Sequence, residues 1–394
     1  MAAPSWSSRQ RFRRSLHAAT GVLACLLAAP PLVAATAAPG RFPSSVLPPA
    51  AEVLMPDAGA PAAEPPAAPG ITVDGERLLR DGEPWIPRGF NMIGLLTPDW
   101  CERRVGVAAR EHFGADELAA ARDWGADALR FQVSQRGLSD PALAEADRAA
   151  YRASVLDGVA QARQAGFTVI VSMQDQFFGC GEVHPMPSAE TVTAWRALVP
   201  ELAEDPGVLL ELFNEPRNED DPAGWAQWRD GGRSPDANLG DAAVGHQALV
   251  DAVREMGSAN VLVADAARLG ERSGGLPLLD DPLDRLTYAV HPYYYVLGEG
   301  WWDEHYGKLA EVAPVLATEW NYLGDECRTD AQRLAPDLLD YLHQHSIGVF
   351  GHSFDIPGTT VADWSWTPTR CGTAAGGSGA LLQNHFRSLA RAGD

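Results

Sequence analysis

Short apolar runs alternate along this sequence with longer stretches that carry apolar residues at helical spacing. The eight runs are Trp85–Asn91, Asp127–Val133, Phe167–Met173, Val208–Asn214, Val261–Ala264, Leu286–His291, Pro314–Thr318 and Ile347–His352. The clearest helical patterns between them are Tyr151–Ala165, Thr191–Leu202, Val244–Met256 and Ala331–Gln344. Such alternation is typical of a parallel sheet covered by helices, and eight strands favour a closed (β/α)8 barrel. No glycine-rich phosphate-binding motif follows the first run, which disfavours the alternative of an open doubly wound sheet.

The domain is expected to begin with a small hairpin before the first run. Ile71–Leu79 alternates apolar and polar residues around an Asp-Gly pair, as in a β-hairpin. From there, residues 71–394 have the usual length of one barrel domain. Within it, Gly166 marks the expected end of a helix. The segment Gly270–Pro282 is so rich in Gly, Pro and Asp that it defines no helix.

The first seventy residues differ from the rest of the chain. Residues 1–37 combine a basic start, the apolar stretch Ala18–Val33 and small residues suited to cleavage, which predicts a secretory signal peptide. The apolar stretch is short and interrupted by Pro30-Pro31, so we expect no membrane anchor in the mature form. Residues 38–70 are Ala- and Pro-rich and predict a disordered linker. The protein is therefore expected to be secreted.

The charge of the chain limits its partners. The formal net charge is -21, and removal of residues 1–37 would take away four arginines and no acid. A field of this sign repels the phosphate backbone of nucleic acids, so we expect no nucleic-acid partner. A neutral polysaccharide or oligosaccharide is not repelled. We expect the mature chain to act as a monomer.

Four cysteines remain after loss of the expected signal peptide, which contains Cys25. Cys101, Cys180, Cys327 and Cys371 are widely spaced, without the close pairs of a zinc site, and so predict disulfides. Four cysteines allow three pairings, and the sequence alone does not choose among them. Because the seventh and eighth strands of a barrel are neighbours, we prefer Cys327–Cys371, which leaves Cys101–Cys180.

Polar residues follow most of the apolar runs at the point where each expected strand ends. They are Asn91, Arg130, Gln174, Asp175, Asn214, Glu215, His291, Tyr293, Glu319 and His352. Catalytic residues of a (β/α)8 barrel come from the C-terminal ends of its strands. A purely structural barrel has no need of such a series, so these residues predict an active site.

Several of these strand ends carry a resemblance to a known family. The run Val208–Arg217, with Asn214-Glu215-Pro216 at its end, resembles the signature segment of glycoside hydrolase family 5, which contains many cellulases and mannanases. Further segments resemble the first, second, sixth and seventh strands of that family: Arg88–Asn91, Leu129–Phe131, His291–Tyr293 and Ala317–Trp320. The resemblance spans roughly 71–394 and implies a retaining β-glycosidase domain.

The resemblance also implies roles for individual residues. Glu215 matches the acid/base of the family and Glu319 its nucleophile, the two carboxyl groups that retaining hydrolysis requires. Arg130 near Glu319 would lower the pKa of the nucleophile, and Tyr293 would donate a hydrogen bond to it. Asn214 would bind the 2-hydroxyl of the sugar.

Arg130 and His291 each have an alternative, structural role. Arg130 has a second possible partner in Glu211, which shares the alternation of Glu215 and is expected to point inward as a support residue. His291 either contacts substrate or is a packed histidine whose ring nitrogens are satisfied by the protein.

The sequence departs from the family at two strand ends. Gln174 stands where the family usually has a histidine, and His352 stands where it usually has the tryptophan on which a sugar stacks. An imidazole packs less well than an indole against a sugar face, so the usual cellulase substrate is in question. Of the loop tryptophans, Trp320 and Trp302 are our preferred candidates for sugar platforms, although a loop tryptophan is about as often a packing anchor for the loop itself.

Taken together, the sequence predicts a retaining, endo-acting hydrolase of a β-glycan, with β-1,4-glucan or β-mannan preferred. Two alternatives stay open: an exo-acting glycosidase or transglycosylase on the same site, and a carbohydrate-binding protein without catalysis. The chemistry needs no metal or cofactor, and no cofactor motif is found.

Overall fold

The computed structural model of the chain describes residues 70–96, 109–175, 184–233, 242–321, 329–371 and 377–392. All of them belong to one compact unit, Pro65–Asp394. The expected signal peptide and residues 38–69 of the expected linker lie outside the described residues.

Eight parallel strands form a closed barrel. In order around it they are β10 (Val315–Trp320), β11 (Gly348–Gly351), β4 (Arg88–Met92), β5 (Ala128–Ser134), β6 (Thr168–Gln174), β7 (Val208–Glu211), β8 (Leu262–Asp265) and β9 (Leu286–Val290). Each strand overlaps one of the predicted apolar runs, so the (β/α)8 prediction is confirmed.

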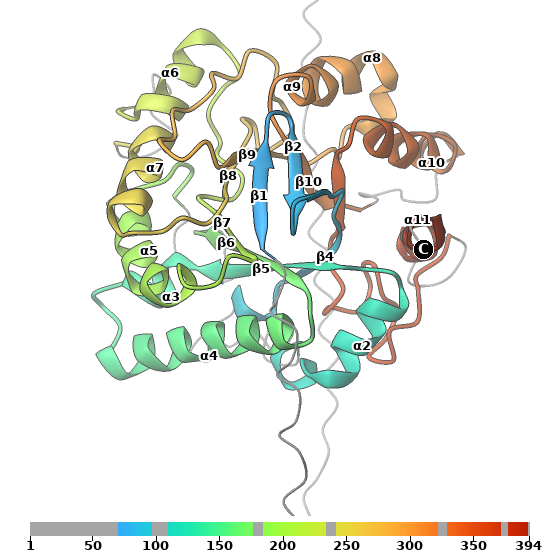
Figure 1. The fold of residues 1–394 in the computed structure, drawn as a ribbon, viewed down its shortest axis with the longest axis horizontal. Helices are drawn as coiled ribbons and strands as arrows, with labels where there is room; N and C mark the ends of the chain where they lie inside the picture. Colours follow the sequence, from blue (N-terminus) through green and yellow to red (C-terminus); the bar gives the residue numbers. More distant parts are fainter. Residues whose placement is uncertain are drawn as a thin grey trace, which may run out of the picture. The chain divides into compact units, whose positions relative to one another are not determined.

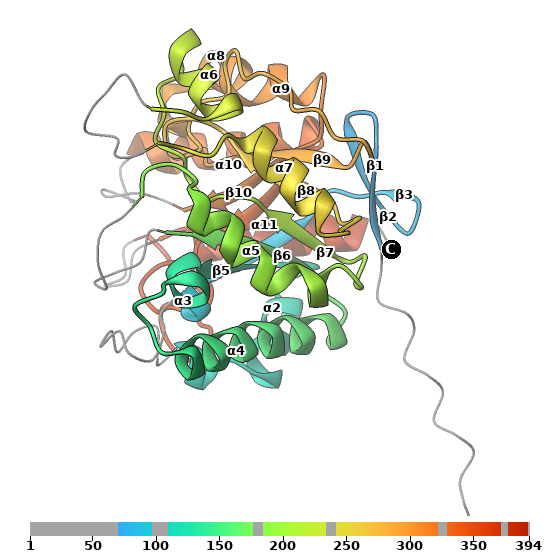
Figure 2. The ribbon, with the colours of Figure 1, turned by 90° about the vertical axis from the view of Figure 1, so that its left-hand side faces the viewer.

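Helices surround the barrel (Figures 1 and 2). They are α2 (Ala115–Asp123), α3 (Gln135–Ser139), α4 (Glu145–Gln164), α5 (Ala189–Leu202), α6 (Pro222–Asp230), α7 (His246–Glu255), α8 (Glu299–Trp302), α9 (Lys308–Ala310), α10 (Thr329–Gln344) and α11 (Gly379–Ala392), with the short turns η1 (Gly94–Leu96), η3 (Tyr295–Leu297) and η4 (Asp303–Gly307). The four predicted helical patterns correspond to α4, α5, α7 and α10. Among the described helices, none has both the length and the apolar composition needed to cross a bilayer.

Local sequence signals set the ends of these elements. Helix α4 stops at the predicted place, where Gly166 has φ +86° and its N–H donates to the carbonyl of Arg163 at 2.8 Å. Between β8 and β9, residues 266–285 are all described and form no helix, in keeping with their Gly, Pro and Asp content. The chain instead makes a tight turn in which Ala267 pairs with Arg272.

An N-terminal hairpin closes one end of the barrel. Strands β1 (Ile71–Asp74) and β2 (Arg77–Arg80) are antiparallel around the predicted Asp-Gly turn, and β3 (Glu83–Pro84) follows. Ile71 and Leu78 pack with side chains that fill the barrel interior, including those of Ile170, Leu209, Leu316 and Phe350. The hairpin lies at the end where the strands begin (Figure 2), which leaves the C-terminal end for a site.

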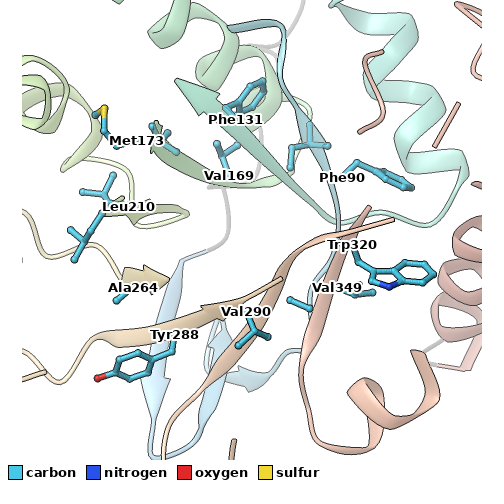
Figure 3. Packing of buried hydrophobic residues seen from close by; sticks show 14 of the residues in the cluster. Phe90, Phe131, Val169, Met173, Leu210, Ala264, Tyr288, Val290, Trp320 and Val349 are labelled. Carbon is cyan, nitrogen blue, oxygen red and sulfur yellow. The ribbon is translucent and has the colours of Figure 1, made fainter. Parts of the chain in front are cut away.

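The larger core lies between the strands and the helices. Every barrel strand contributes to it, as Figure 3 shows for Phe90, Phe131, Val169, Met173, Leu210, Ala264, Tyr288, Val290, Trp320 and Val349. Strand residues therefore alternate between this outer core and the barrel interior.

Strand β10 departs from this alternation through a β-bulge. It pairs with β11 through Ala317 opposite Val349 and then Trp320 opposite Gly351, so β10 has one residue more than its partner. Ala317 and Trp320 both face the outer core. The two residues between them, Thr318 and Glu319, therefore both face the interior.

Candidate active site

Polar side chains from the strand ends gather at the C-terminal end of the barrel. Hydrogen bonds and charge contacts connect Asn91, Arg130, Gln132, Ser172, Glu211, Asn214, Glu215, Asp265, His291, Tyr293, Thr318, Glu319 and His352. The group includes every predicted strand-end residue except Gln174 and Asp175, together with the predicted support residue Glu211. The structure adds four residues that were not predicted: Gln132, Ser172, Asp265 and Thr318.

Arg130 lies at the centre of this network and is fully buried. Its Nη1 donates to Oε1 of Glu319 at 2.7 Å, and its Nε donates to Oε2 of Glu211 at 2.7 Å. Arg130 therefore binds both Glu319 and Glu211, which the sequence analysis gave as alternative partners. Because each carboxylate stabilises the buried guanidinium, the pKa of Arg130 is raised even though burial opposes its charge.

Two asparagines and Ser172 also accept hydrogen bonds from Arg130. Asn91 accepts from Nη1 at 2.6 Å and donates through its own Nδ2 to the carbonyl of Thr318 at 2.8 Å. Asn214 accepts from Nη2 at 2.6 Å. Since the amide oxygen of Asn214 faces the guanidinium, its NH2 group is directed away from it and remains a donor.

Glu319 accepts three hydrogen bonds. Its Oε1 receives Arg130 and Nε2 of Gln132, each at 2.7 Å, and its Oε2 receives the hydroxyl of Tyr293 at 3.2 Å. The predicted contacts of Arg130 and Tyr293 with Glu319 are therefore present. Gln132 was missed, although it lies two residues after Arg130 on β5 and so shares its inward direction.

The surroundings of Glu319 favour its charged form. Burial alone would raise the pKa of this carboxyl, but the positive charges of His352, His291 and Arg130 lower it to about 2. Glu319 is therefore an ionised carboxylate over the whole range from mildly acidic to alkaline pH.

Glu215 follows β7 in a strained backbone conformation. Its φ is +53°, which is uncommon for a residue with a side chain, and its N–H donates to Oδ2 of Asp265 at 2.9 Å. Asp265 is fully buried at the end of β8. It was missed because the predicted strand stopped at Ala264, one residue before the end that carries this side chain.

His291 links the two glutamates. Its Nδ1 lies 3.0 Å from Oε1 of Glu215 and 3.9 Å from Oε2 of Glu319, and its Nε2 lies 3.0 Å from Oγ1 of Thr318. Burial lowers the pKa of this imidazole, but Glu319, Glu215 and Asp265 raise it to about 9. The ring is buried with both nitrogens partnered by the protein, as in the second of the two predicted alternatives.

The two glutamates are close together but differently surrounded. A carboxylate oxygen of Glu215 and one of Glu319 lie within 4.8 Å of each other. Glu319 is buried and held by cationic and neutral donors, whereas the side chain of Glu215 is 17% exposed. Such a pair can divide the work of nucleophile and proton donor.

The site also has ligand atoms in an arrangement that a metal ion can use. The two groups with mutually close atoms are Glu211, Asp265 and His291, and Glu215, His291 and Glu319. However, Arg130 already binds a carboxylate in each group, and its fixed positive charge opposes a cation there. The residues fit a proton-transfer site better than a metal site.

The two departures from the family occupy the predicted strand ends. Gln174 is the last residue of β6 and is buried. His352 follows β11, and its Nε2 lies 3.7 Å from Oε2 of Glu319 with a quarter of the side chain exposed. An imidazole therefore stands beside the carboxylate where the family resemblance led us to expect an indole.

The prediction that Trp320 and Trp302 form sugar platforms is wrong. Trp320 is fully buried and packs edge-on against Tyr295, because the bulge in β10 turns it into the outer core. Trp302 is also buried, and its Nε1 donates to the carbonyl of Tyr295 at 2.9 Å. Both indoles anchor the loops around them and present no face to a ligand.

The predicted disulfides are only partly within the described residues. Cys371 is disulfide-bonded. Cys101, Cys180 and Cys327 lie outside the described residues, so the preferred pairing Cys327–Cys371 and the remaining pair Cys101–Cys180 stay predictions.

Comparison with protein families agrees with this site. A family model described as cellulase (glycosyl hydrolase family 5) matches residues 102–356. The chain belongs to glycosyl hydrolase family 5. It is therefore a glycoside hydrolase, and the matched range includes β5 to β11 with both glutamates. A comparison with curated protein sequences gives no significant match.

Solved structures share the fold of this family 5 chain at low sequence identity. A β-glucanase from Saccharophagus degradans in complex with cellotetraose is 18% identical, with a TM-score of 0.59 over 82% of this chain and 94% of that one. An endocellulase from Pyrococcus horikoshii is 15% identical, with a TM-score of 0.57 over 83% and 100%. The catalytic domain of a Thermobifida fusca endoglucanase, also with cellotetraose, is 16% identical, with a TM-score of 0.56 over 81% and 97%.

Proposed function

We propose that this protein is a secreted, retaining, endo-acting hydrolase of a neutral β-glycan, with β-1,4-glucan preferred and β-mannan second. Glu319 is the nucleophile and Glu215 the acid/base. The observation that carries the proposal is the pair of carboxyl groups within 4.8 Å of each other, in surroundings that keep Glu319 ionised.

The reaction follows from these positions. The Glu319 carboxylate attacks the anomeric carbon and forms an ester bond, while Glu215 gives its proton to the leaving oxygen as the glycosidic bond breaks. Glu215 then takes a proton from water, which attacks the anomeric carbon and releases Glu319. The configuration of the sugar is retained because two inversions occur.

The spacing of the carboxyl groups supports retention. Retaining enzymes separate them by about 5–5.5 Å, whereas inverting enzymes leave about 6.5–9.5 Å for a water molecule. The closest oxygens of Glu215 and Glu319 lie within 4.8 Å of each other, which agrees with the shorter of these two separations.

The residues around the pair support the same chemistry. Arg130 and Tyr293 hold Glu319 through both of its oxygens, which fixes the direction of attack. The NH2 group of Asn214 is placed to bind a sugar hydroxyl, a contact that strengthens in the transition state. Asp265 holds the backbone of Glu215 and so sets the position of the proton donor.

The preference for a glucan rests on charge and on the solved relatives. The chain is strongly acidic, which favours a neutral substrate. All three of the solved structures were crystallised with cellotetraose. The exo-acting, transglycosylating and binding-only alternatives use the same residues and differ in their products.

The test is release of reducing sugar from a panel of β-glucans, mannans, xylans and galactans by the wild type and by Glu319→Gln. We expect one polymer to be cleaved into a range of oligosaccharides and the variant to be inactive. Release of a single small sugar would favour exo action, and products longer than the substrate would favour transglycosylation. Binding without cleavage, or cleavage that survives in Glu319→Gln, would contradict the assigned site.

Secretion has a separate test. In cells that express the full chain, we expect the protein in the medium with its N-terminus near residue 38, as read by mass spectrometry. A cell-associated protein that retains residues 1–37 would contradict this part of the proposal.

A further inference from the structure

His352 is the departure from the family that lies nearest to the nucleophile. Its Nε2 is 3.7 Å from Oε2 of Glu319, and a quarter of its side chain is exposed. An indole at this place would be uncharged, whereas an imidazole that is protonated on both nitrogens is a cation. The chain therefore has a chargeable group, in place of a stacking surface, beside an atom that reacts.

The two oxygens of Glu319 are held differently. Oε1 accepts hydrogen bonds from Arg130 and Gln132, each at 2.7 Å, whereas the hydroxyl of Tyr293 donates to Oε2 at the longer distance of 3.2 Å. The more weakly held oxygen gives up less when it forms a new bond, so Oε2 is the oxygen that attacks the anomeric carbon. His352 lies beside this oxygen.

The charge of His352 acts strongly on Glu319. Burial raises the pKa of this carboxyl, and among the positive charges that attract the carboxylate and lower its pKa, His352 has the largest effect, ahead of His291 and Arg130. A lowered pKa means that the ionised form is stabilised over the neutral form. In the covalent intermediate Glu319 is an ester without charge, so this stabilisation is lost in the first step and regained in the second.

The backbone of His352 is attached to the two residues that follow the nucleophile. Its N–H donates to the carbonyl of Trp320 at 2.9 Å, and its own carbonyl accepts Nδ2 of Asn321 at 2.7 Å. Ser378, which is buried directly before α11, donates to Oδ1 of Asn321 at 2.8 Å. Asn321 therefore connects α11 and the end of β10 with His352, and the backbone that carries the imidazole is fixed before the reaction begins.

We propose that His352 acts in the second half of the reaction, as a fixed positive charge that stabilises the Glu319 carboxylate while it leaves the anomeric carbon, and that Asn321 is the positioning residue of this group. The inference rests on the proposed function, in which Glu319 forms the covalent intermediate. A charge beside the leaving oxygen favours breakdown of the ester and disfavours its formation, because it stabilises the free carboxylate.

The atoms of the step balance. The bond between the anomeric carbon and Oε2 of Glu319 breaks, and its electron pair stays on Oε2, at 3.7 Å from Nε2 of His352. Water forms the new bond to the anomeric carbon and gives a proton to Glu215. His352 neither gives nor takes a proton, and no oxidant, reductant or further reactant takes part.

The test is turnover of dinitrophenyl β-cellobioside, or of the mannobioside if the polymer panel identifies a mannan, by the wild type and His352→Gln. Dinitrophenolate leaves without a proton, so formation of the glycosyl-enzyme is fast and its breakdown limits kcat, whereas kcat/KM reports its formation. The measurement is made at mildly acidic pH, where an imidazole carries a positive charge and Glu319 stays ionised.

We expect His352→Gln to lower kcat about tenfold. Loss of a direct hydrogen-bond donor costs about 10²–10³-fold, and a charge at 3.7 Å lies beyond that contact. The value of kcat/KM should stay the same or rise, so KM should fall together with kcat. Mass spectrometry of enzyme quenched during turnover should show more glycosyl-enzyme in the variant than in the wild type.

Two further variants separate charge and position from shape. His352→Lys keeps a positive charge and should keep more of kcat than His352→Gln. Asn321→Ala removes the donor to the His352 carbonyl, so it should lower kcat in the same selective way but less, with little further loss when it is added to His352→Gln. The matched control is His112→Gln, since His112 is exposed and stacks on Trp364 in the loop after β11 with 4.2 Å between ring centroids. This change should leave kcat and kcat/KM unaltered.

An unchanged kcat in His352→Gln, or equal losses of kcat and kcat/KM, would overturn the inference. A His352→Lys variant that is no faster than His352→Gln would overturn it as well, because the imidazole would then act through its shape. Failure of the proposed function is detected separately, by turnover that persists in Glu319→Gln.

Discussion

Replacing Arg130 with methionine removes the cation from the centre of the network and keeps its apolar stem. Glu211 and Glu319 are then left buried without their shared cationic partner. Breaking a buried ion pair from one side costs about 3–5 kcal/mol of unfolding free energy. His352, His291 and Arg130 together lower the pKa of Glu319 from 4.5 to about 2, so Arg130 supplies only part of that stabilisation.

From the cost of breaking the buried ion pair, we expect Arg130→Met to lower the melting temperature on the order of 10 °C. The loss should depend on pH. A carboxyl group whose pKa is lowered in the folded state stabilises the protein above its unfolded pKa, and this stability is lost as pH falls from about 4.5 to about 2. The difference between wild type and variant should therefore be larger at pH 7 than at pH 3.

The assay is urea unfolding at both pH values, with Arg229→Met as the matched control. Arg229 pairs with Asp280 at the surface, where an ion pair contributes about 0–1 kcal/mol. A loss below 1 kcal/mol for Arg130→Met, or one that is equal at pH 7 and pH 3, would refute the idea that Arg130 stabilises the ionised network.

Three further predictions concern the reaction. Glu215→Gln should lower polymer hydrolysis about 10²–10⁴-fold. It should slow formation of the glycosyl-enzyme from a dinitrophenyl glycoside far less, because that leaving group needs no proton. Equal losses of rate on both substrates would argue against Glu215 as the proton donor. Asp265→Ala removes the acceptor for the Glu215 N–H and should lower kcat about tenfold or more with little change in KM. Asp265→Asn keeps an acceptor and should lose less of kcat. Similar losses of kcat in the two variants would indicate that the charge of Asp265 matters instead. His352→Gln removes a cation that lowers the pKa of Glu319, so the acidic limb of the pH profile of kcat/KM should move to higher pH; an unmoved limb would show that His352 is uncharged in the working enzyme.

The sequence was sufficient for the parts of the fold that depend on repeating patterns. Apolar runs and helical spacing identified all eight strands and the helices α4, α5, α7 and α10. Because strand ends meet at one end of a barrel, the same patterns brought together Arg130, Glu215 and Glu319 without any coordinates. The hairpin was predicted from its Asp-Gly turn and alternation.

The errors have physical causes that no repeating pattern reveals. Trp320 was placed on the wrong side because a bulge cannot be seen in the period of a strand. Asp265 was missed through a strand boundary one residue too short, and such boundaries depend on long-range pairing rather than on local sequence. The left-handed turn at Leu269 gave no signal, because the residue contradicts the usual preference for that conformation.

Because of the bulge in β10, the position of Glu319 depends on the number of residues in this strand as well as on their identity. Deleting one codon for Thr318 would restore regular alternation to the strand, and the deletion would preserve every other residue of the site. Of the two inward-facing residues, only Glu319 would remain, and it would be displaced by one position along the strand. His291 would also lose its hydrogen-bond partner Thr318. We therefore expect evolution to exchange side chains in this segment far more readily than it inserts or removes residues.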